Sequence, residues 1–332
     1  MPIRQGEGSP RREALDWFKN AGWGVFVHYL SNDEWTSEQW NRNVDRFDVE
    51  GLARQLERIG VPYIFITIGQ ISGHYCSPNA TYDAIVGIRP SKCSRRDLVS
   101  DLYEPLARRG IKLLVYLPSD APRLDEEAAQ KLEWEDCETR RNKRLVEYQR
   151  KWESVIREWS LRWGEKISGW WFDGCYFADE MYRHDDEPNF RSFAAAARAG
   201  NDRSLVCFNP GSLPEIICHS EEEDYTAGEI ASHRRPIPPC PGRWVERKGH
   251  KAQWHVLPCA WFYGAPPKYA HFPIEFCIGY TKHVIENEGV ITWEIPISVE
   301  TGLLPHPIVE QFAAISNAIN LPPRTASGLN VT

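Results

Sequence analysis

The chain has 332 residues, of which 42% are hydrophobic, and it carries a net charge of −7. Acidic and basic residues are interspersed and no basic block occurs, which argues against nucleic acid and anionic membrane surfaces as partners. The nine cysteines show neither a CxxC pair nor a zinc-ligand spacing, so we expect no disulfide framework and no zinc site.

Short apolar runs alternate with amphipathic stretches along the chain. The runs predicted to be strands are 22–28, 61–68, 111–117, 168–173, 205–208, 225–229, 253–261 and one that begins at residue 289. Helices are expected at 13–20, between the cap Asp48 and the stop Gly60, and at 95–109, 189–199, 274–287 and 306–319. A long helix is expected to lead from the charged stretch 123–144 to Trp163, whereas 31–43 and 232–251 are expected to be loops.

This alternation of strands and helices is typical of parallel βαβ units. Eight units in a chain of this length fit a TIM-like (β/α)8 barrel of the α/β class. We expect one catalytic domain over residues 1–332, with its core at about 13–320. A doubly wound open sheet is the alternative, but no glycine-rich phosphate loop follows an early strand. Strands five and six are too closely spaced for a full helix between them, so we expect an irregular barrel there.

Polar residues stand where the predicted strands end, and barrel enzymes carry their catalytic groups on that side. Asp173 follows an apolar run and precedes Gly174, although an Asp-Gly pair is also an ordinary turn signal. Glu229 ends predicted strand six, but it follows a run of acidic residues and could belong to a solvated face. The other candidates at strand ends are His28, Gln70, His74, Tyr116, Asn209, His255 and Glu294.

Asp173 and Glu229 lie on predicted strands separated by one strand, which is the arrangement that a glycosidase needs. One carboxylate attacks or supports the anomeric carbon, and the other protonates the leaving oxygen. The chain has 14 Trp, whose flat faces suit sugar rings, and burial among them would raise the pKa of the acid. A metal-dependent hydrolase is the rival, but Phe26 and Leu30 occupy the ligand positions around His28. No metal and no cofactor is expected.

Several stretches resemble, in the same order, the family 29 glycoside hydrolases, which are retaining α-L-fucosidases. The resemblance covers about residues 15–320. The family's Phe-x-Ile-His-Trp-Gly strand is similar to 25–29, its Trp-x-Asp-Gly nucleophile motif to 171–174, and its Asp-aromatic-x-Thr-x-Glu acid/base stretch to 224–229, with one residue fewer. The other similar stretches are Glu34-Trp35, Phe47-Asp48, 60–63 and 288–290.

The resemblance implies a retaining exo-glycosidase with Asp173 as nucleophile and Glu229 as acid/base. It implies a carbohydrate substrate, either an oligosaccharide or a glycoconjugate. A catalytically silent sugar-binding barrel is the alternative from another class. The residues expected to bind the sugar are His28, Trp35, Gln70, His74, Tyr116, Trp171, Asn209, His255 and Trp293.

The chain departs from the family in its second loop and after its fifth strand. The family's Lys-His-His-Asp-Gly run is here 69–73, with Gln70 and Ile71 in place of the paired histidines, and Pro210 replaces an arginine. We therefore expect the preferred glycone to be related to α-L-fucose but not fucose itself, unless His74 restores the lost contact.

The two ends of the sequence lead to expectations about oligomer contacts and localisation. The C-terminal β-sandwich of many members is not found, which is expected to expose a barrel face for contacts between copies. The N-terminal residues contain no apolar signal-peptide core, and no later run is long enough to span a membrane. The sequence as it stands predicts a cytoplasmic protein, or a periplasmic or secreted one if a signal peptide has been removed.

Overall fold

A curled, eight-stranded parallel sheet forms the centre of the molecule, with strand order β5-β4-β3-β2-β1-β10-β9-β6. The computed structural model describes residues 10–32, 34–120, 122–135, 143–231, 237–259 and 272–320. Strand β1 pairs with β2 on one side and with β10, the last strand in the chain, on the other. The strands are β1 (Trp23–Val27), β2 (Tyr63–Thr67), β3 (Lys112–Pro118), β4 (Gly169–Asp173), β5 (Leu205–Phe208), β6 (Glu229–Ala231), β9 (His255–Cys259) and β10 (Val290–Glu294).

Among the described residues β5 and β6 share no main-chain ladder, so the sheet closes incompletely between them. Asp224 fills the gap: its N–H donates to the Val206 carbonyl at 2.8 Å, and its carboxylate accepts the Val206 N–H at 2.9 Å. On the other side, the Asp224 carbonyl accepts the N–H of Gln253. The fold is thus a mixed α/β fold whose sheet is consistent with a TIM-like barrel, and its irregular closure lies at the predicted strands five and six.

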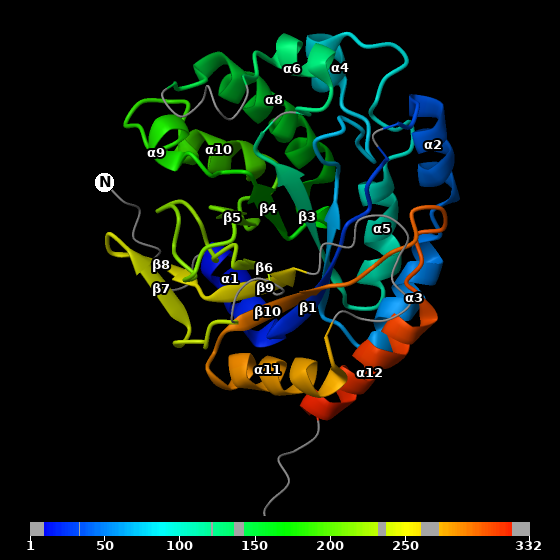
Figure 1. Ribbon diagram of the computed structural model, residues 1–332, viewed down its shortest axis with the longest axis vertical. Helices are drawn as coiled ribbons and strands as arrows, with labels where there is room; N and C mark the ends of the chain where they lie inside the picture. The colour runs from blue at the N-terminus through cyan, green and yellow to red at the C-terminus, as the bar shows by residue number, and fades with distance from the viewer. Residues whose placement is uncertain are drawn as a thin grey trace, which may run out of the picture.

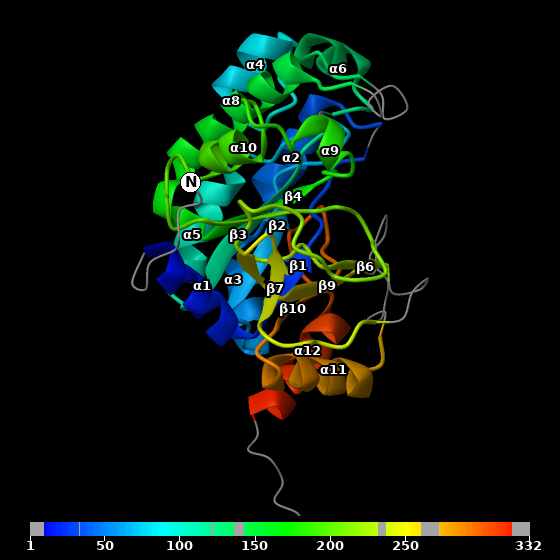
Figure 2. The same ribbon diagram turned by 90° about the vertical axis from the view of Figure 1, so that its left-hand side faces the viewer.

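Helices cover the outside of this sheet, from α8 and α10 beside β4 and β5 to α11 and α12 beside β10 (Figures 1 and 2). Asp48 caps α3 by accepting the Gly51 N–H at 2.7 Å, and Gly60 ends it with φ 80°. No helix of the described ranges is long and apolar enough to cross a membrane. The helices are α1 (Pro10–Ala21), α2 (Ser37–Arg46), α3 (Val49–Ile59), α4 (Ala80–Val86), α5 (Leu98–Ala107), α6 (Glu126–Leu132), α8 (Val146–Trp163), α9 (Ala178–Met181), α10 (Phe190–Ala197), α11 (Ile274–Glu286) and α12 (His306–Asn320).

The structure differs from the prediction in several connections. The expected loop at 31–43 contains the start of α2, which begins with a capping box between Thr36 and Gln39. The expected loop at 232–251 contains the antiparallel hairpin of β7 (Trp244–Arg247) and β8 (His250–Gln253). The long helix expected from 123–144 to Trp163 is instead α6 and α8, and its residues 136–142 lie outside the described ranges, as do 260–261 of predicted strand seven.

The interior of the curled sheet is filled from below by α1. Phe18 of that helix packs against Tyr63, Tyr225 and His255, with ring centroids 5.0–5.6 Å apart. Tyr63 and His255 are the first residues of β2 and β9, so this contact closes the amino ends of the strands. The candidate site therefore lies at the opposite end, where the carboxyl ends of parallel strands meet.

Candidate active site

A cavity of about 940 Å³ opens among the loops that follow the carboxyl ends of the strands. This volume lies in the ordinary range for a small-molecule site. Its floor is aromatic, and the rings of Tyr116 and Trp171 stack there with centroids 5.3 Å apart. The polar and charged side chains that line it are His28, Ser31, Asn32, Gln70, Ser72, Asp120, Arg123, Asp173, Tyr176, Glu229, Ser298 and Glu300.

Asp173 ends β4, and its carboxylate accepts four hydrogen bonds. Its Oδ1 accepts the N–H of Gly174 at 2.8 Å, the side-chain amide of Asn209 at 2.8 Å and the hydroxyl of Tyr176 at 3.3 Å. Its Oδ2 accepts the Tyr116 hydroxyl at 2.6 Å. An ionised carboxylate satisfies all of these donors, and they fix the direction in which it points.

The side-chain nitrogen of Asn209 joins the two predicted catalytic carboxylates. It donates to Oδ1 of Asp173 and to Oε2 of Glu229. Because both oxygens lie within hydrogen-bond reach of one atom, they are at most about 6 Å apart. Asn209 is fully buried and follows β5, and its own oxygen accepts the N–H of Gly211 at 3.0 Å, which fixes the orientation of the amide.

Glu229 is the first residue of β6 rather than the last residue of the strand predicted at 225–229. Gly228 precedes it with φ 66°, and a Cβ at that position would lie 2.0 Å from the His255 carbonyl oxygen. The backbone that leads into Glu229 therefore requires glycine at position 228. Desolvation, and then the negative charge of Asp173, raise the pKa of Glu229 to about 7. A carboxyl group in this state can donate a proton near neutral pH.

A chain of hydrogen bonds leads from Gln70 to the Asp173 carboxylate. The Gln70 side-chain amide donates to the hydroxyl of Tyr116, which in turn donates to Asp173. Burial, together with the neighbouring Asp173 charge, raises the pKa of Tyr116, so its hydroxyl remains a donor. Gln70 lines the cavity but directs its amide to Tyr116.

Tyr176, Asp120 and Arg123 line the cavity and were not predicted from the sequence. They lie in the loops after β4 and β3, where no periodicity marks a side chain as inward or outward. Asp120 is buried, and its carboxylate lies 3.8 Å from the Arg123 guanidinium. The pKa of Tyr176 is raised, first by the charge of Asp173 and then by burial, so its hydroxyl also stays protonated.

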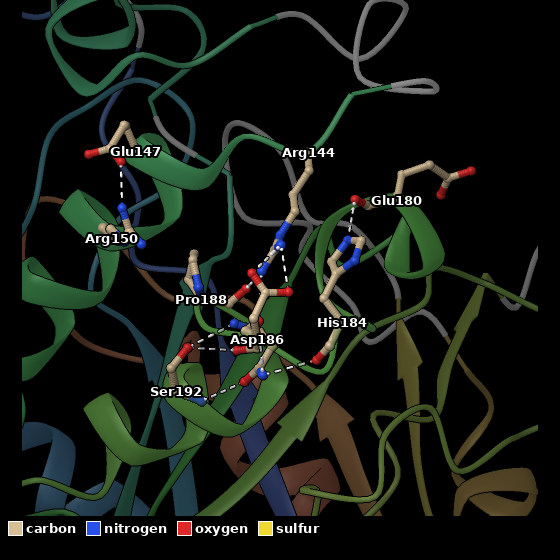
Figure 3. A network of polar contacts seen from close by, with 9 residues as sticks. Arg144, Glu147, Arg150, Glu180, His184, Asp186, Pro188 and Ser192 are labelled. Carbon is tan, nitrogen blue, oxygen red and sulfur yellow. Dashed lines mark hydrogen bonds and ion pairs between the residues drawn. The ribbon is translucent and has the colours of Figure 1, made fainter.

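Polar contacts hold the long connection between β4 and α10, which carries Tyr176 (Figure 3). The Arg144 guanidinium donates to the Asp186 carboxylate at 3.0–3.1 Å and to the carbonyls of Asp186 and Pro188 at 2.7 Å. Asn189 caps α10 and forms a capping box with Ser192. The connection is therefore anchored at its far end from the cavity.

His28 follows β1 and lines the cavity, as does Trp35 in the next loop. The Nδ1 atom of His28 lies 2.7 Å from Oε1 of Glu294, the last residue of β10. Glu294 was a candidate at a strand end, and the structure pairs it with this histidine.

Four residues expected to bind the sugar are not part of the cavity wall. Asn209 is one of them, and its amide is directed to Asp173 and Glu229. The other three lie away from the cavity. His255 begins β9 and is fully buried, and its ring hydrogen-bonds to Thr226 and Thr292. Trp293 turns outward to the helix layer, where its N–H donates to Thr281 of α11 at 2.9 Å. His74 is 3% exposed, neither ring nitrogen has a hydrogen-bond partner, and burial lowers its pKa to about 4. The structure therefore does not bring these three side chains to the predicted sugar site.

Other acidic residues near Glu229 in the sequence do not reach the cavity wall. Glu223 is fully buried and accepts the N–H of His219 at 2.6 Å. Glu246 lies on β7 and is exposed. Within the described ranges no cluster of three or more His, Cys, Asp and Glu side chains could hold a metal ion.

No protein-family model and no curated protein matches the sequence. The fold is similar to that of an endo-fucoidan hydrolase of glycoside hydrolase family 107, with a TM-score of 0.69 and 15% identity over 94% of each chain. It is also similar to α-L-fucosidase isoenzyme 1 from Paenibacillus thiaminolyticus, with a TM-score of 0.60 and 15% identity over 93% of this chain and 76% of that one. A putative α-L-fucosidase from Bacteroides thetaiotaomicron has a TM-score of 0.64 and 14% identity over 93% and 67%. At these identities the similarity establishes the fold, and the reaction has to be argued from the site.

Proposed function

We propose that this protein is a retaining glycoside hydrolase of the fucosidase type, acting on a terminal α-L-fucose or a related sugar. The observation that carries the proposal is the Asn209 amide shared by Asp173 and Glu229. Carboxyl groups about 5–5.5 Å apart are typical of retaining enzymes, whereas inverting enzymes need about 6.5–9.5 Å to admit a water. The similarity in fold to fucosidases and an endo-fucoidan hydrolase supports fucose or a relative as the sugar.

In the first step Asp173 attacks the anomeric carbon, and the bond to the leaving oxygen breaks. Glu229, protonated because its pKa is about 7, transfers its proton to that oxygen, and the aglycone leaves as an alcohol. The product is a glycosyl ester on Asp173 and an ionised Glu229.

In the second step a water molecule attacks the same carbon from the face that the aglycone has left. Glu229 takes the proton of that water, and the ester oxygen of Asp173 leaves as a carboxylate. Two inversions at one carbon give net retention. Asn209 contacts both carboxylates and so stabilises whichever one carries the charge in each step.

The preferred glycone differs from plain α-L-fucose. Ile71 lines the cavity. At the corresponding place in this loop, the family 29 enzymes that the sequence resembles carry a second histidine. The isoleucine side chain offers neither a hydrogen-bond donor nor an acceptor. Leaving a sugar hydroxyl buried and unpaired costs about 1–3 kcal/mol, or on the order of 5- to 150-fold in specificity. His74 does not replace the lost contact, because its ring is buried outside the cavity wall.

A panel of aryl glycosides of L-fucose, L- and D-galactose, L-rhamnose and L-arabinose tests the proposal. We expect turnover with retention, observed by NMR of the first-formed sugar, and a better substrate than the fucoside. Asp173→Asn should lose more than ~10²-fold in kcat while keeping its thermal unfolding transition. Inversion of the product, or an Asp173→Asn enzyme with more than a tenth of the activity, would refute the mechanism. Sugar binding without any turnover would identify a sugar-binding protein instead.

A further inference from the structure

Glu294 is a carboxylate in an otherwise apolar position. It is the last residue of β10, beside Phe26 of β1 in the sheet register, and its side chain is 1% exposed. A buried carboxylate is costly unless it is paired, and an apolar residue would pack at this place without that cost. Glu294 thus calls for an explanation in terms of the group that it contacts.

One such group is the imidazole of His28, which lies between Glu294 and the cavity. Glu294 is not part of the cavity wall formed by the described residues, whereas His28 is. The contact uses Nδ1 of the ring at 2.7 Å, so the opposite edge, with Nε2, is turned away from Glu294. The Phe26 ring packs edge-on against the imidazole at 4.6 Å and holds it from below.

We propose that Glu294 is a positioning residue that places the proton of His28 on Nδ1 and presents Nε2 to the sugar. A carboxylate that accepts from Nδ1 fixes both the tautomer and the rotation of the ring. Without it the imidazole can flip, and the polar atom that meets a sugar hydroxyl is no longer defined. This inference rests on the proposed function of the same site, because it assigns the substrate contact to His28.

The pair also acts on the proposed proton donor through its charges. Glu229 is surrounded by Asp173 of β4, His28 after β1 and Glu294 of β10, with the Cys259 thiol of β9 and the Tyr176 hydroxyl nearby. The Glu294 charge raises the pKa of Glu229, and His28 lowers it. Removing the Glu294 charge therefore lowers that pKa and moves the alkaline limb of the pH profile to lower pH.

The test compares E294Q, H28N and the double variant on the best aryl glycoside of the panel. Asn at position 28 retains a donor toward Glu294 but removes the Nε2 edge. We expect E294Q to lower kcat/KM by about 10- to 100-fold, mainly through KM, and to lower the pH of the alkaline limb. In the H28N background, E294Q should cause less than about a threefold further loss in the pH-independent kcat/KM, because the positioning effect passes through His28. The shift of the alkaline limb should persist there, because the Glu294 charge acts on Glu229 directly.

E153Q is the matched control. Glu153 is a carboxyl group of α8 that accepts the Ser192 hydroxyl at 2.7 Å, and burial raises its pKa to about 7. It is not part of the cavity wall, so removing this titrating group should leave KM and the alkaline limb unchanged. Losses of E294Q and H28N that multiply in the double variant would overturn the proposal. So would an E294Q enzyme with a lowered unfolding temperature but unchanged kinetics.

If the wild-type protein binds sugars without turnover, the proposed function fails but the pair remains testable. The same variants are then compared by calorimetric titration with the free sugars of the panel. A weaker affinity in E294Q that vanishes in the H28N background supports the positioning role. Equal affinity of E294Q and the wild type refutes it. Should E294Q not fold, E294D, which keeps the charge but draws it back from Nδ1, takes its place in both assays and should show the same non-additivity.

Discussion

Replacing Asn209 by alanine tests how the two carboxylates share one donor. The variant removes the amide that donates to Asp173 and to Glu229. The hydrogen bond from Asn209 to Glu229 lowers the pKa of Glu229. A hydrogen bond to a charged group contributes about 1.5–3 kcal/mol. Since about 1.4 kcal/mol corresponds to one pKa unit, the pKa of Glu229 should rise by about one to two units.

The assay is the pH dependence of kcat/KM, whose alkaline limb reports the proton donor of the free enzyme. The limb should lie near 7 in the wild type, as the pKa of Glu229 requires, and at about 8–9 in Asn209→Ala. Asn201→Ala removes an amide that donates to the Ile167 carbonyl at 3.1 Å outside the cavity wall, and should leave the limb in place. If turnover of Asn209→Ala is too slow, ¹³C NMR of labelled glutamate follows the same titration. An unchanged limb, or one at lower pH, would refute the shared-donor argument.

Two further predictions follow from the same geometry. The pKa of Glu229 is raised from 4.5 to about 7 in the fold, so its contribution to stability is present below 4.5 and is lost as the pH rises to about 7. Glu229→Gln should therefore gain in unfolding temperature relative to the wild type across that window and keep a constant difference above it; a difference independent of pH would contradict the shift. Tyr116→Phe removes the 2.6 Å hydrogen bond to Asp173 and should lower kcat by about 10- to 150-fold. Tyr176→Phe removes a longer hydrogen bond of 3.3 Å from an exposed ring and should lower kcat by less than about 10-fold. The reverse order of the two losses in kcat would refute this assignment.

Most strands of the sheet could be predicted because each is a short apolar run between polar breaks, but β6 begins where the strand predicted at 225–229 ends, and the hairpin of β7 and β8 lies in a predicted loop. Asp173 could be placed at the end of β4 for that reason, and β5 was predicted with its observed limits. Trp293 could not be oriented, because every residue of β10 is buried and the run shows no alternation of polar and apolar residues. His255 was misassigned as a strand-end candidate, because it lies near the start of the strand predicted at 253–261 and begins β9, at the end of the sheet opposite to the cavity.

Loops limited the prediction of the site more than strands did. Asp120 and Tyr176 reach the cavity from connections whose paths depend on tertiary contacts. Glu294 could be found as an acidic residue at a strand end, but its partner His28 is 266 positions away in the chain. Such a pair follows from the adjacency of the first and last strands, which the barrel topology implies and local sequence patterns do not.

The gap between β5 and β6, here called the seam, lies between the strand that carries Asp173 and its neighbour β5 on one side and the strand that carries Glu229 on the other. Asp173 belongs to a strand with a ladder on each side, whereas Glu229 belongs to one that, among the described residues, forms a ladder with β9 alone. At the seam, Asp224 is hydrogen-bonded to Val206 of β5, and its carboxylate lies 2.6 Å from the guanidinium of Arg198. The main chain and carboxylate of Asp224, rather than a strand ladder, therefore link the two sides. If Asp173 and Glu229 act as proposed, substitutions at Arg198 or Asp224 would change the position of Glu229 more than that of Asp173, and so would affect proton donation to the leaving group before nucleophilic attack.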